Sequence, residues 1–184
     1  MQPLTEKTIR SSFINASRQE AKKLTLPENF DSLDWDSLDY LGWRDPKMMQ
    51  RGYLLHTDGT GRTRGILLRP TDGGRKPNNA TMCEMCRDVN IPSAVGMWTT
   101  KRAGQAGRDG NTLGTLICLN FECSRNVRIP PPKNPIYPDP MVVVAERIQL
   151  LDERVHSFLN RLVFTRRKWC KSIFALAKII MFSC

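Results

Sequence analysis

The sequence contains no long apolar run and no apolar segment near its start. A helix that crosses a membrane needs about 18 consecutive apolar residues. The longest candidate, residues 173–182, has ten residues and is interrupted by Lys178. The opening residues MQPLTEKTIRSSF also lack the apolar centre of a secretion signal. These absences lead us to expect a cytoplasmic protein without a membrane span.

Cysteine is too sparse for a disulfide-rich secreted domain, with six residues in a chain of 184. In a reducing compartment such cysteines are typical of metal binding more than of disulfides. The sequence also shows no nucleophile, base and orienting group in a catalytic pattern. We therefore expect a binding protein and not an enzyme.

The net charge of +10 is distributed unevenly along the chain. Residues 161–184 carry six basic residues and no acidic residue, and residues 62–108 carry nine basic and three acidic residues. Residues 28–45 hold six acidic residues against Arg44 alone. Basic zones attract nucleic acid, acidic proteins or anionic membrane, and charge alone does not choose among these partners.

The residue patterns predict an α+β fold with a small antiparallel sheet. Helices are expected near the N-terminus, because Thr5 precedes apolar residues at helical spacing and Ser17 forms a capping box with Glu20. Turn-forming residues 58–61 predict a hairpin. Residues 141–164 predict a long helix whose single apolar stripe folds back onto the core. The predicted strands are residues 52–56, 63–68, 94–99 and 115–118.

Three less regular segments separate these elements. The acidic residues 31–46 are interpreted as an ordered loop or short helix whose aromatic side chains pack on the core. Residues 71–80 and the glycine-rich residues 101–114 are predicted to be loops. His56 lies near the end of a predicted strand, and we interpret it as a partly buried structural residue, not a ligand or acid–base group.

Four of the six cysteines have the spacing of a zinc site. Cys83 and Cys86 form a C-x-x-C pair, and after 31 intervening residues Cys118 and Cys123 form a second pair. Structural Zn²⁺ prefers four such thiolates in a closed tetrahedron. A redox pair would leave the second pair unexplained, and two disulfides would need an oxidising compartment. A turn, a hairpin and a ligand pair leading into a helix follow one another as in a treble-clef finger.

The segments around these cysteines resemble a known family. Residues 83–86, 102–107, 110–118 and 123–128, above all the run GNTLGTLIC, are similar to the C-terminal domain of elongation-factor-G-binding proteins. That family includes the FusB-type fusidic acid resistance proteins. The runs PLTEKTIRSSFINAS and DYLGWRDP resemble the compact actinobacterial members that carry this domain alone. The resemblance covers residues 2 to about 163.

This resemblance implies a treble-clef finger in which one structural Zn²⁺ is held by Cys83, Cys86, Cys118 and Cys123. It also implies elongation factor G as the partner, because FusB-type members bind this factor and help it leave the ribosome when fusidic acid has stalled it. We expect the protein to differ from those resistance proteins in lacking their separate helical N-terminal domain. It also carries Glu84 where an aromatic contact could lie. Factor binding is therefore the expectation, and drug resistance is not part of it.

The expected partner-binding residues are Lys101, Arg102 and Arg108 in the glycine-rich segment. They can present cations to an acidic face of the factor. Alternatively they contact the phosphates of ribosomal RNA, and the chain would then be a ribosome- or RNA-binding finger. A solvated hairpin tip without a partner is the third interpretation.

The C-terminal segment combines basic residues, Trp169 and an apolar run. This composition fits an interfacial helix with weak affinity for an anionic membrane. An incidental extension of the preceding helix is the simpler interpretation, and it leaves Cys170 and Cys184 as ordinary thiols. The expected parts of the chain are a domain, its finger, its long helix and this tail: residues 1–164, 83–128, 141–164 and 165–184.

Overall fold

The computed structural model describes residues 1–71, 81–87, 94–132 and 139–163. Its centre is a five-stranded sheet in which β1 to β5 lie side by side in chain order, each antiparallel to the next. The strands are β1 Leu41–Arg44, β2 Gly52–Thr57, β3 Thr63–Pro70, β4 Val95–Lys101 and β5 Thr112–Cys118. The helices are α1 Glu6–Ser11, α2 Arg18–Lys23, α3 Gly104–Arg108, α4 Cys123–Val127 and α5 Pro140–Val163. The α+β fold with a long C-terminal helix is confirmed.

The sheet consists of two hairpins joined by a short pairing, with β1 added at the edge of the first hairpin. β2 and β3 form the predicted first hairpin, whose turn is closed by the Asp58 carboxylate accepting hydrogen bonds from the N–H groups of Thr60 and Arg62. β4 and β5 form the second hairpin and are both longer than the predicted strands. Between the hairpins, β3 and β4 pair only where Arg69 faces Thr99 and Pro70 faces Trp98.

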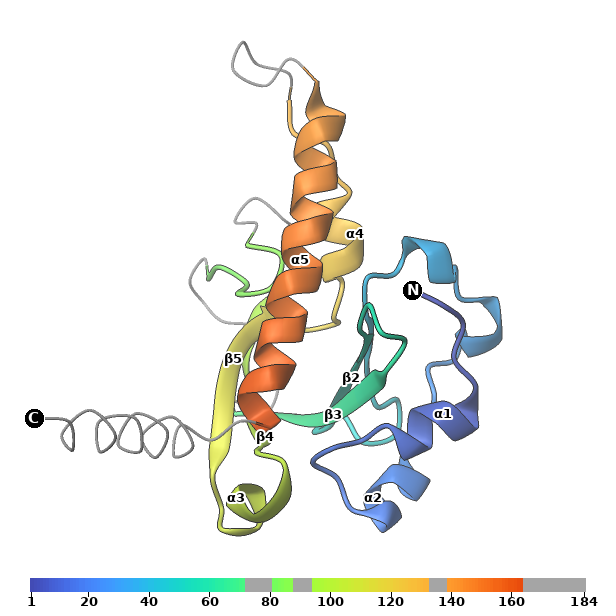
Figure 1. Cartoon of the computed structure of the whole chain (residues 1–184), viewed down its shortest axis with the longest axis vertical. Coiled ribbons are helices and arrows are strands. Elements are labelled where there is room, and N and C mark those ends of the chain that lie inside the picture. The colour runs from blue at the N-terminus through green and yellow to red at the C-terminus, as the bar shows by residue number, and fades with distance from the viewer. Residues whose placement is uncertain (72–80, 88–93, 133–138, 164–184) are drawn as a thin grey trace, which may run out of the picture.

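The two faces of the β2–β3 hairpin are covered by different helices (Figure 1). Alternating side chains of a strand point to opposite faces, so each apolar set has its own cover. The first core cluster joins one face to the N-terminal segment and contains Ile9, Leu24, Leu41, Trp43, Tyr53, Leu55 and Leu67. The second joins the other face to α5 and includes Leu54, Ile66, Leu68, Leu151, Val155, Phe158, Leu159 and Leu162.

The helix signals read from the sequence are confirmed by side-chain contacts. The Thr5 hydroxyl accepts a hydrogen bond from the N–H of Thr8 at the start of α1. Both halves of the capping box between Ser17 and Glu20 are present at the start of α2. The apolar stripe of α5 packs onto the sheet as expected, and Leu151 is fully buried.

Two segments contain more regular structure than predicted. The acidic segment forms 3₁₀ turns at Phe30–Ser32 and Trp35–Ser37 and then strand β1, which pairs with β2 along its whole length. The glycine-rich segment contains the helix α3, whereas a loop was predicted. Gly107 permits this helix, because a Cβ atom there would lie 1.8 Å from the carbonyl oxygen of Arg102.

Within the described ranges no helix is both long and apolar enough to cross a membrane. The predicted tail over residues 165–184, which includes Trp169, Cys170 and Cys184, lies outside the described residues. The same holds for residues 72–80 of the predicted loop.

Candidate metal centre

The first cysteine pair lies in a tight turn that is fastened to the sheet. The N–H of Arg87 donates to the carbonyl of Cys83 over 2.9 Å, which closes the turn around Cys86. Arg87 itself adopts a positive φ of 53°. The N–H of Glu84 donates to the carbonyl of Leu116 in β5 over 2.8 Å. The hairpin therefore fixes the position of the turn.

The second pair lies where β5 leads into α4. Cys118 is the last residue of β5 and Cys123 is the first residue of α4. Phe121, at a positive φ of 59°, donates its N–H to the carbonyl of Cys118 over 2.9 Å. The side-chain amide of Asn126 also donates to the Cys118 sulfur over 3.5 Å. A hydrogen bond to a ligand sulfur orients it and supports its thiolate form.

The four sulfur atoms are arranged for one tetrahedral ion. Cys83 and Cys123 are separated by 3.6 Å between sulfurs, Cys86 and Cys118 by 3.8 Å, and all four sulfurs lie within 4.8 Å of one another. Four Zn–S bonds of about 2.3 Å in a tetrahedron place sulfurs about 3.8 Å apart. A disulfide would bring two sulfurs to about 2.05 Å. The cysteines are unbridged and buried, so this donor set fits zinc.

The electrostatics of the cluster also call for a cation. A hydrogen bond from the thiol of Cys118 lowers the pKa of Cys83 strongly, because it stabilises the thiolate. The pKa of Cys123 is raised, first by its hydrogen bond with Cys118 and further by burial and by negative charge on Cys83. The thiol of Cys83 therefore loses its proton readily, whereas the thiol of Cys123 keeps its proton. A central metal cation would stabilise all four as thiolates at once.

Tyr40 forms a support for the cluster that the sequence did not reveal. Its hydroxyl donates to the carbonyl of Phe121 over 3.1 Å, across 81 positions of the chain. Burial and then the negative charge of Cys123 raise the pKa of Tyr40 well above its usual range, so the hydroxyl keeps its proton. The run DYLGWRDP marks this segment in the sequence, but no local pattern predicts so distant a contact.

Asp39 makes a second contact between this segment and the finger. Its carboxylate accepts two hydrogen bonds from the Arg128 guanidinium, over 2.6 and 3.0 Å. Its backbone N–H donates to the hydroxyl of Ser124 in α4 over 3.1 Å. The residues before β1 therefore hold α4 against the body of the protein.

The three predicted partner-binding residues lie at the opposite end of the β4–β5 hairpin from the cysteines. In the register of this hairpin Val95 faces Cys118, whereas Lys101 faces Thr112. Lys101, Arg102 and Arg108 line one hollow on the surface, so the structure brings them together. The Arg102 guanidinium donates to the carbonyl of Arg161 over 2.5 Å, which attaches the hairpin tip to the end of α5.

His56 occupies a buried position between β2 and α5. Its side chain is about 1% exposed, and Nε2 lies 2.6 Å from a carboxylate oxygen of Asp152. Beside this pair, the Arg64 guanidinium donates to the amide oxygen of Asn160 over 2.7 Å. These polar contacts join the β2–β3 hairpin to α5, which agrees with a structural role for His56.

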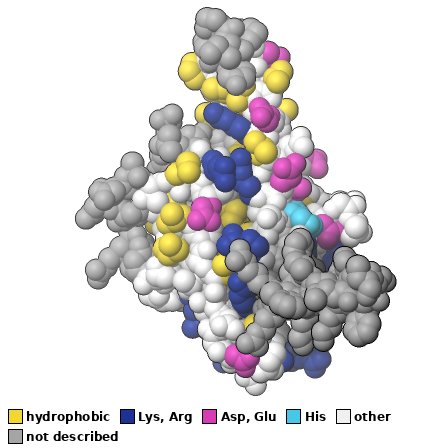
Figure 2. Space-filling model, turned by 60° about the vertical axis from the view of Figure 1, so that its left-hand side comes forward, with side chains coloured by type: hydrophobic (Ala, Val, Ile, Leu, Met, Phe, Trp, Pro, Cys, Tyr) yellow, Lys and Arg dark blue, Asp and Glu magenta, His cyan; other side chains and the backbone are white. Residues whose placement is uncertain are grey.

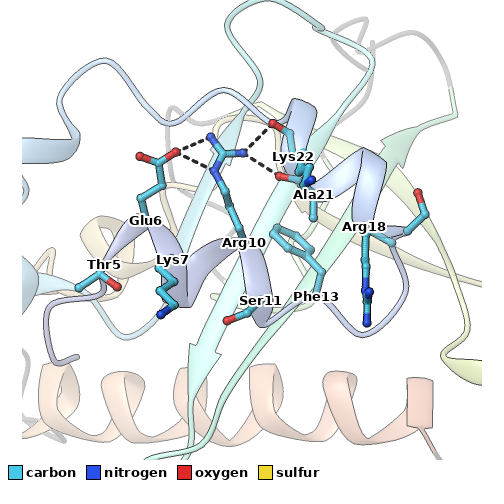
Figure 3. Close-up of a pocket in the computed structure, with 11 residues that line it drawn as sticks. Thr5, Glu6, Lys7, Arg10, Ser11, Phe13, Arg18, Ala21 and Lys22 are labelled. Carbon is cyan, nitrogen blue, oxygen red and sulfur yellow. Dashed lines mark hydrogen bonds and ion pairs between the residues drawn. The ribbon is translucent and has the colours of Figure 1, made fainter.

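A further hollow lies between α1 and α2, far from the cysteines in the chain (Figure 3). Arg10 crosses it, bonded to the Glu6 carboxylate on one side and to the carbonyls of Ala21 and Lys22 on the other. We call this hollow the α1–α2 groove. Its basic residues besides Arg10 are Lys7, Arg18 and Lys22, all of them exposed.

Comparisons with known proteins identify one matching family and one similar solved structure. The family model of the FBP C-terminal treble-clef zinc-finger matches residues 8–162. The chain is similar to a solved structure titled "Structure of the fusidic acid resistance protein FusC", at 21% identity and a TM-score of 0.45. That alignment covers 71% of this chain and 53% of the FusC chain, so the chain spans about half the length of FusC. No curated protein matches the chain.

The family match and the four buried cysteines together fit one structural Zn²⁺. The turn, the β4–β5 hairpin and the second pair leading into α4 follow in the order expected from the sequence. The chain belongs to the FBP C-terminal treble-clef zinc-finger family.

Proposed function

We propose that this chain is a cytoplasmic, zinc-stabilised binding module that recognises elongation factor G. The main support for a binding role is the closed cysteine cluster, in which four side chains are all buried: Cys83, Cys86, Cys118 and Cys123. As the four ligands of Zn²⁺, they would fill its tetrahedral positions and leave none for water or a substrate. The metal then supplies stability, not catalysis, and the protein acts through its surface.

The choice of partner is supported by the family. The match extends over residues 8–162, which includes the N-terminal helices, the sheet and most of α5. The sequence segments around the cysteines resemble proteins that bind elongation factor G. A translation factor is therefore the partner class that family membership favours, and elongation factor G is the specific candidate.

The hairpin tip is the surface that we assign to this contact. Lys101 and Arg108 are exposed there, and Arg102 is held by its bond to the Arg161 carbonyl. The N–H of Ala103 adds a bond to the carbonyl of Leu162 over 3.1 Å. A tip held in place before binding loses less conformational entropy on association. Its positive charge also steers an acidic partner surface toward it.

The proposal is tested by titrating purified elongation factor G against the full chain and a Lys101→Glu/Arg108→Glu variant. We expect the variant to bind at least about tenfold more weakly, because reversed charges repel the acidic surface that the native tip attracts. Arg102 stays in place to preserve its bond to α5. A Lys7→Glu/Lys23→Glu variant has the same charge change in α1 and α2 and should bind like the native chain.

Three results would each count against part of this proposal. Equal affinity of the hairpin variant, with unchanged zinc content, would exclude the tip as the contact. No binding of the factor by the native chain would refute elongation factor G as the partner. Salt-dependent binding of ribosomal RNA without binding of the factor would favour the RNA-binding alternative for this same tip.

A further inference from the structure

Three arginines meet in a hollow between the Cys83–Cys86 turn and α5. Arg87 comes from the turn, and Arg154 and Arg161 come from α5, with Ser157 between them on the helix. This hollow is distinct from the hairpin tip, although Arg102 reaches the carbonyl of Arg161 from that side.

Among the residues that the structure describes, the charged side chains lining this hollow are the three arginines and one carboxylate, Glu84, so its net charge is positive. Within the described ranges, none of the guanidinium groups of Arg87, Arg154 and Arg161 has a carboxylate within 4.0 Å. The Arg154 guanidinium donates to the carbonyl of Met85 over 3.0 Å, which fixes its position beside the turn. Burial first and the nearby charge of Arg87 second lower the pKa of Arg154, while the negative charges of Cys86, Glu153 and Cys83 act in the opposite direction. An anion in the hollow would relieve this repulsion.

The hollow forms part of a longer row of cations. Arg147, Arg154 and Arg161 are spaced by seven residues in α5, so they lie on one side of the helix. Successive members are about 10.5 Å apart along the helix axis. Figure 2 shows Lys and Arg side chains in a column along this face of the molecule. We call the set of Arg87, Arg147, Arg154 and Arg161 the arginine row.

We infer that the arginine row binds the phosphate backbone of RNA. Guanidinium groups bind phosphate oxygens through two parallel hydrogen bonds, which a lysine ammonium does not provide. A nucleic acid backbone carries a charge at every nucleotide, whereas carboxylates on a protein surface are irregularly placed. An extended row of arginines, even with Glu84 in the hollow, therefore suits a polyanion better than an acidic patch on a protein. The choice of RNA rests on the proposed function, since elongation factor G works on the ribosome.

The turn of the metal centre contributes directly to this site. Arg87 follows Cys86 and is held at its positive φ by the hydrogen bond to the Cys83 carbonyl. Its guanidinium is thus presented by a backbone that the zinc site fixes. Phosphate contacts of this kind position a nucleic acid and do not read its sequence, so we expect binding with little sequence preference.

The test uses the zinc-loaded full chain and a fluorescently labelled ribosomal RNA stem-loop, with affinity measured by anisotropy at several salt concentrations. An Arg87→Gln/Arg154→Gln/Arg161→Gln variant should lose at least about tenfold in affinity at moderate salt. The slope of log K against log salt should become shallower by about 2 to 3, because each phosphate contact contributes about 0.7 to 0.9. A Lys7→Gln/Arg18→Gln/Lys22→Gln variant removes equal charge from the α1–α2 groove and should keep the native slope.

The outcomes separate this site from general attraction and from the proposed factor binding. Equal losses in both triple variants, or no RNA binding by the native chain, would overturn the proposal. So would a row variant that binds RNA normally but no longer binds elongation factor G, since the row would then face a protein. If removal of Arg154 reduces zinc content, the Arg87→Gln/Arg161→Gln variant replaces it, with an expected slope change of about 1.4 to 1.8.

Discussion

At Gly52 the backbone of β2 passes so close to two aromatic rings that no side chain fits. A Cβ atom there would lie 2.6 Å from Cζ of Phe121 and 2.7 Å from Cζ3 of Trp98. Phe121 sits between the two cysteines of the second pair, in the left-handed region with a φ of 59°. The start of β2 and the second half of the metal site are therefore packed against each other.

Gly52→Ala should destabilise the protein by about 1 to 3 kcal/mol, because an added methyl group overpacks this contact. Urea denaturation of the zinc-loaded protein measures the change. Gly59→Ala is the matched control, since nothing lies within 4 Å of a Cβ atom at that position. Equal stability of the two variants would show that the Phe121 contact is looser than described.

Residues whose role depends on local spacing could be predicted, and residues whose role depends on distant contacts could not. The first cysteine pair can be recognised in the sequence because the two residues between Cys83 and Cys86 define a tight turn that directs both sulfurs to one side. Tyr40 gives no such signal, since its partner Phe121 is 81 positions away. Arg87 also gives no signal in the sequence, because Arg154, which lines the same hollow, lies far away along the chain in α5.

At the scale of elements, the contact between Asp39 and Arg128 holds the segment before β1 to α4. The carboxylate and the guanidinium share two hydrogen bonds, and the Asp39 side chain is only 8% exposed. Such charge-assisted bonds with little solvent access contribute more to stability than exposed ion pairs do.

Asp39→Asn should lower the free energy of unfolding by about 1.5 to 3 kcal/mol, since an amide supplies only one acceptor for the guanidinium. The Asp39 backbone bond to Ser124 remains, so the change reports on the carboxylate alone. Asp36→Asn, at an exposed position of the same segment, should have almost no effect. Thermal unfolding of both variants at one zinc concentration makes the comparison, and equal midpoints would refute the role of this pair.

Elements with strong local signals were predicted, and those made by tertiary contact were missed. The caps of α1 and α2 and the apolar period of α5 are visible in the sequence and are confirmed. Strand β1 has four residues within an acidic segment and gains its structure from pairing with β2. Helix α3 contains glycines, which disfavour helices, and the backbone of Arg102 lies so close to Gly107 that no side chain fits there.

For the molecule as a whole, acid should weaken the fold through carboxyl groups such as Asp45. Its buried carboxylate accepts hydrogen bonds from the Tyr53 hydroxyl over 2.8 Å and from the N–H groups of Lys47, Met48 and Thr25. Burial alone would raise the pKa of Asp45, but these hydrogen bonds outweigh it and lower the pKa. The resulting stability is present above the unfolded pKa and is lost as the pH falls through the folded pKa.

Asp45→Asn should therefore cost about 1.5 to 3 kcal/mol at pH 7. The difference from the native chain should stay constant down to about pH 4 and shrink below it, because there the Asp45 carboxylate of the unfolded chain takes up a proton before that of the folded chain does. Urea denaturation across this range measures both quantities. An Asp34→Asn variant, exposed in the same region, should follow the native curve. A difference that does not change below pH 4 would show that Asp45 has no depressed pKa.

The fold class and the zinc site could be predicted from the sequence, because both depend on local residue patterns and on resemblance to a known family. The surface that acts on a partner could not, since charge runs in the sequence do not show which cations converge. The arginine row joins residue 87 to residues 147–161, and only the folded chain brings them together.

We propose that Cys83, Cys86, Cys118 and Cys123 hold one zinc ion around which the finger forms. Elemental analysis of the purified full chain, with zinc counted per chain, tests it most directly. We predict one zinc per native chain, a clear loss in Cys86→Ser, and no loss in a Cys170→Ser/Cys184→Ser control. Unchanged zinc in Cys86→Ser, or a native chain purified under reducing conditions that takes up no zinc, would contradict the account.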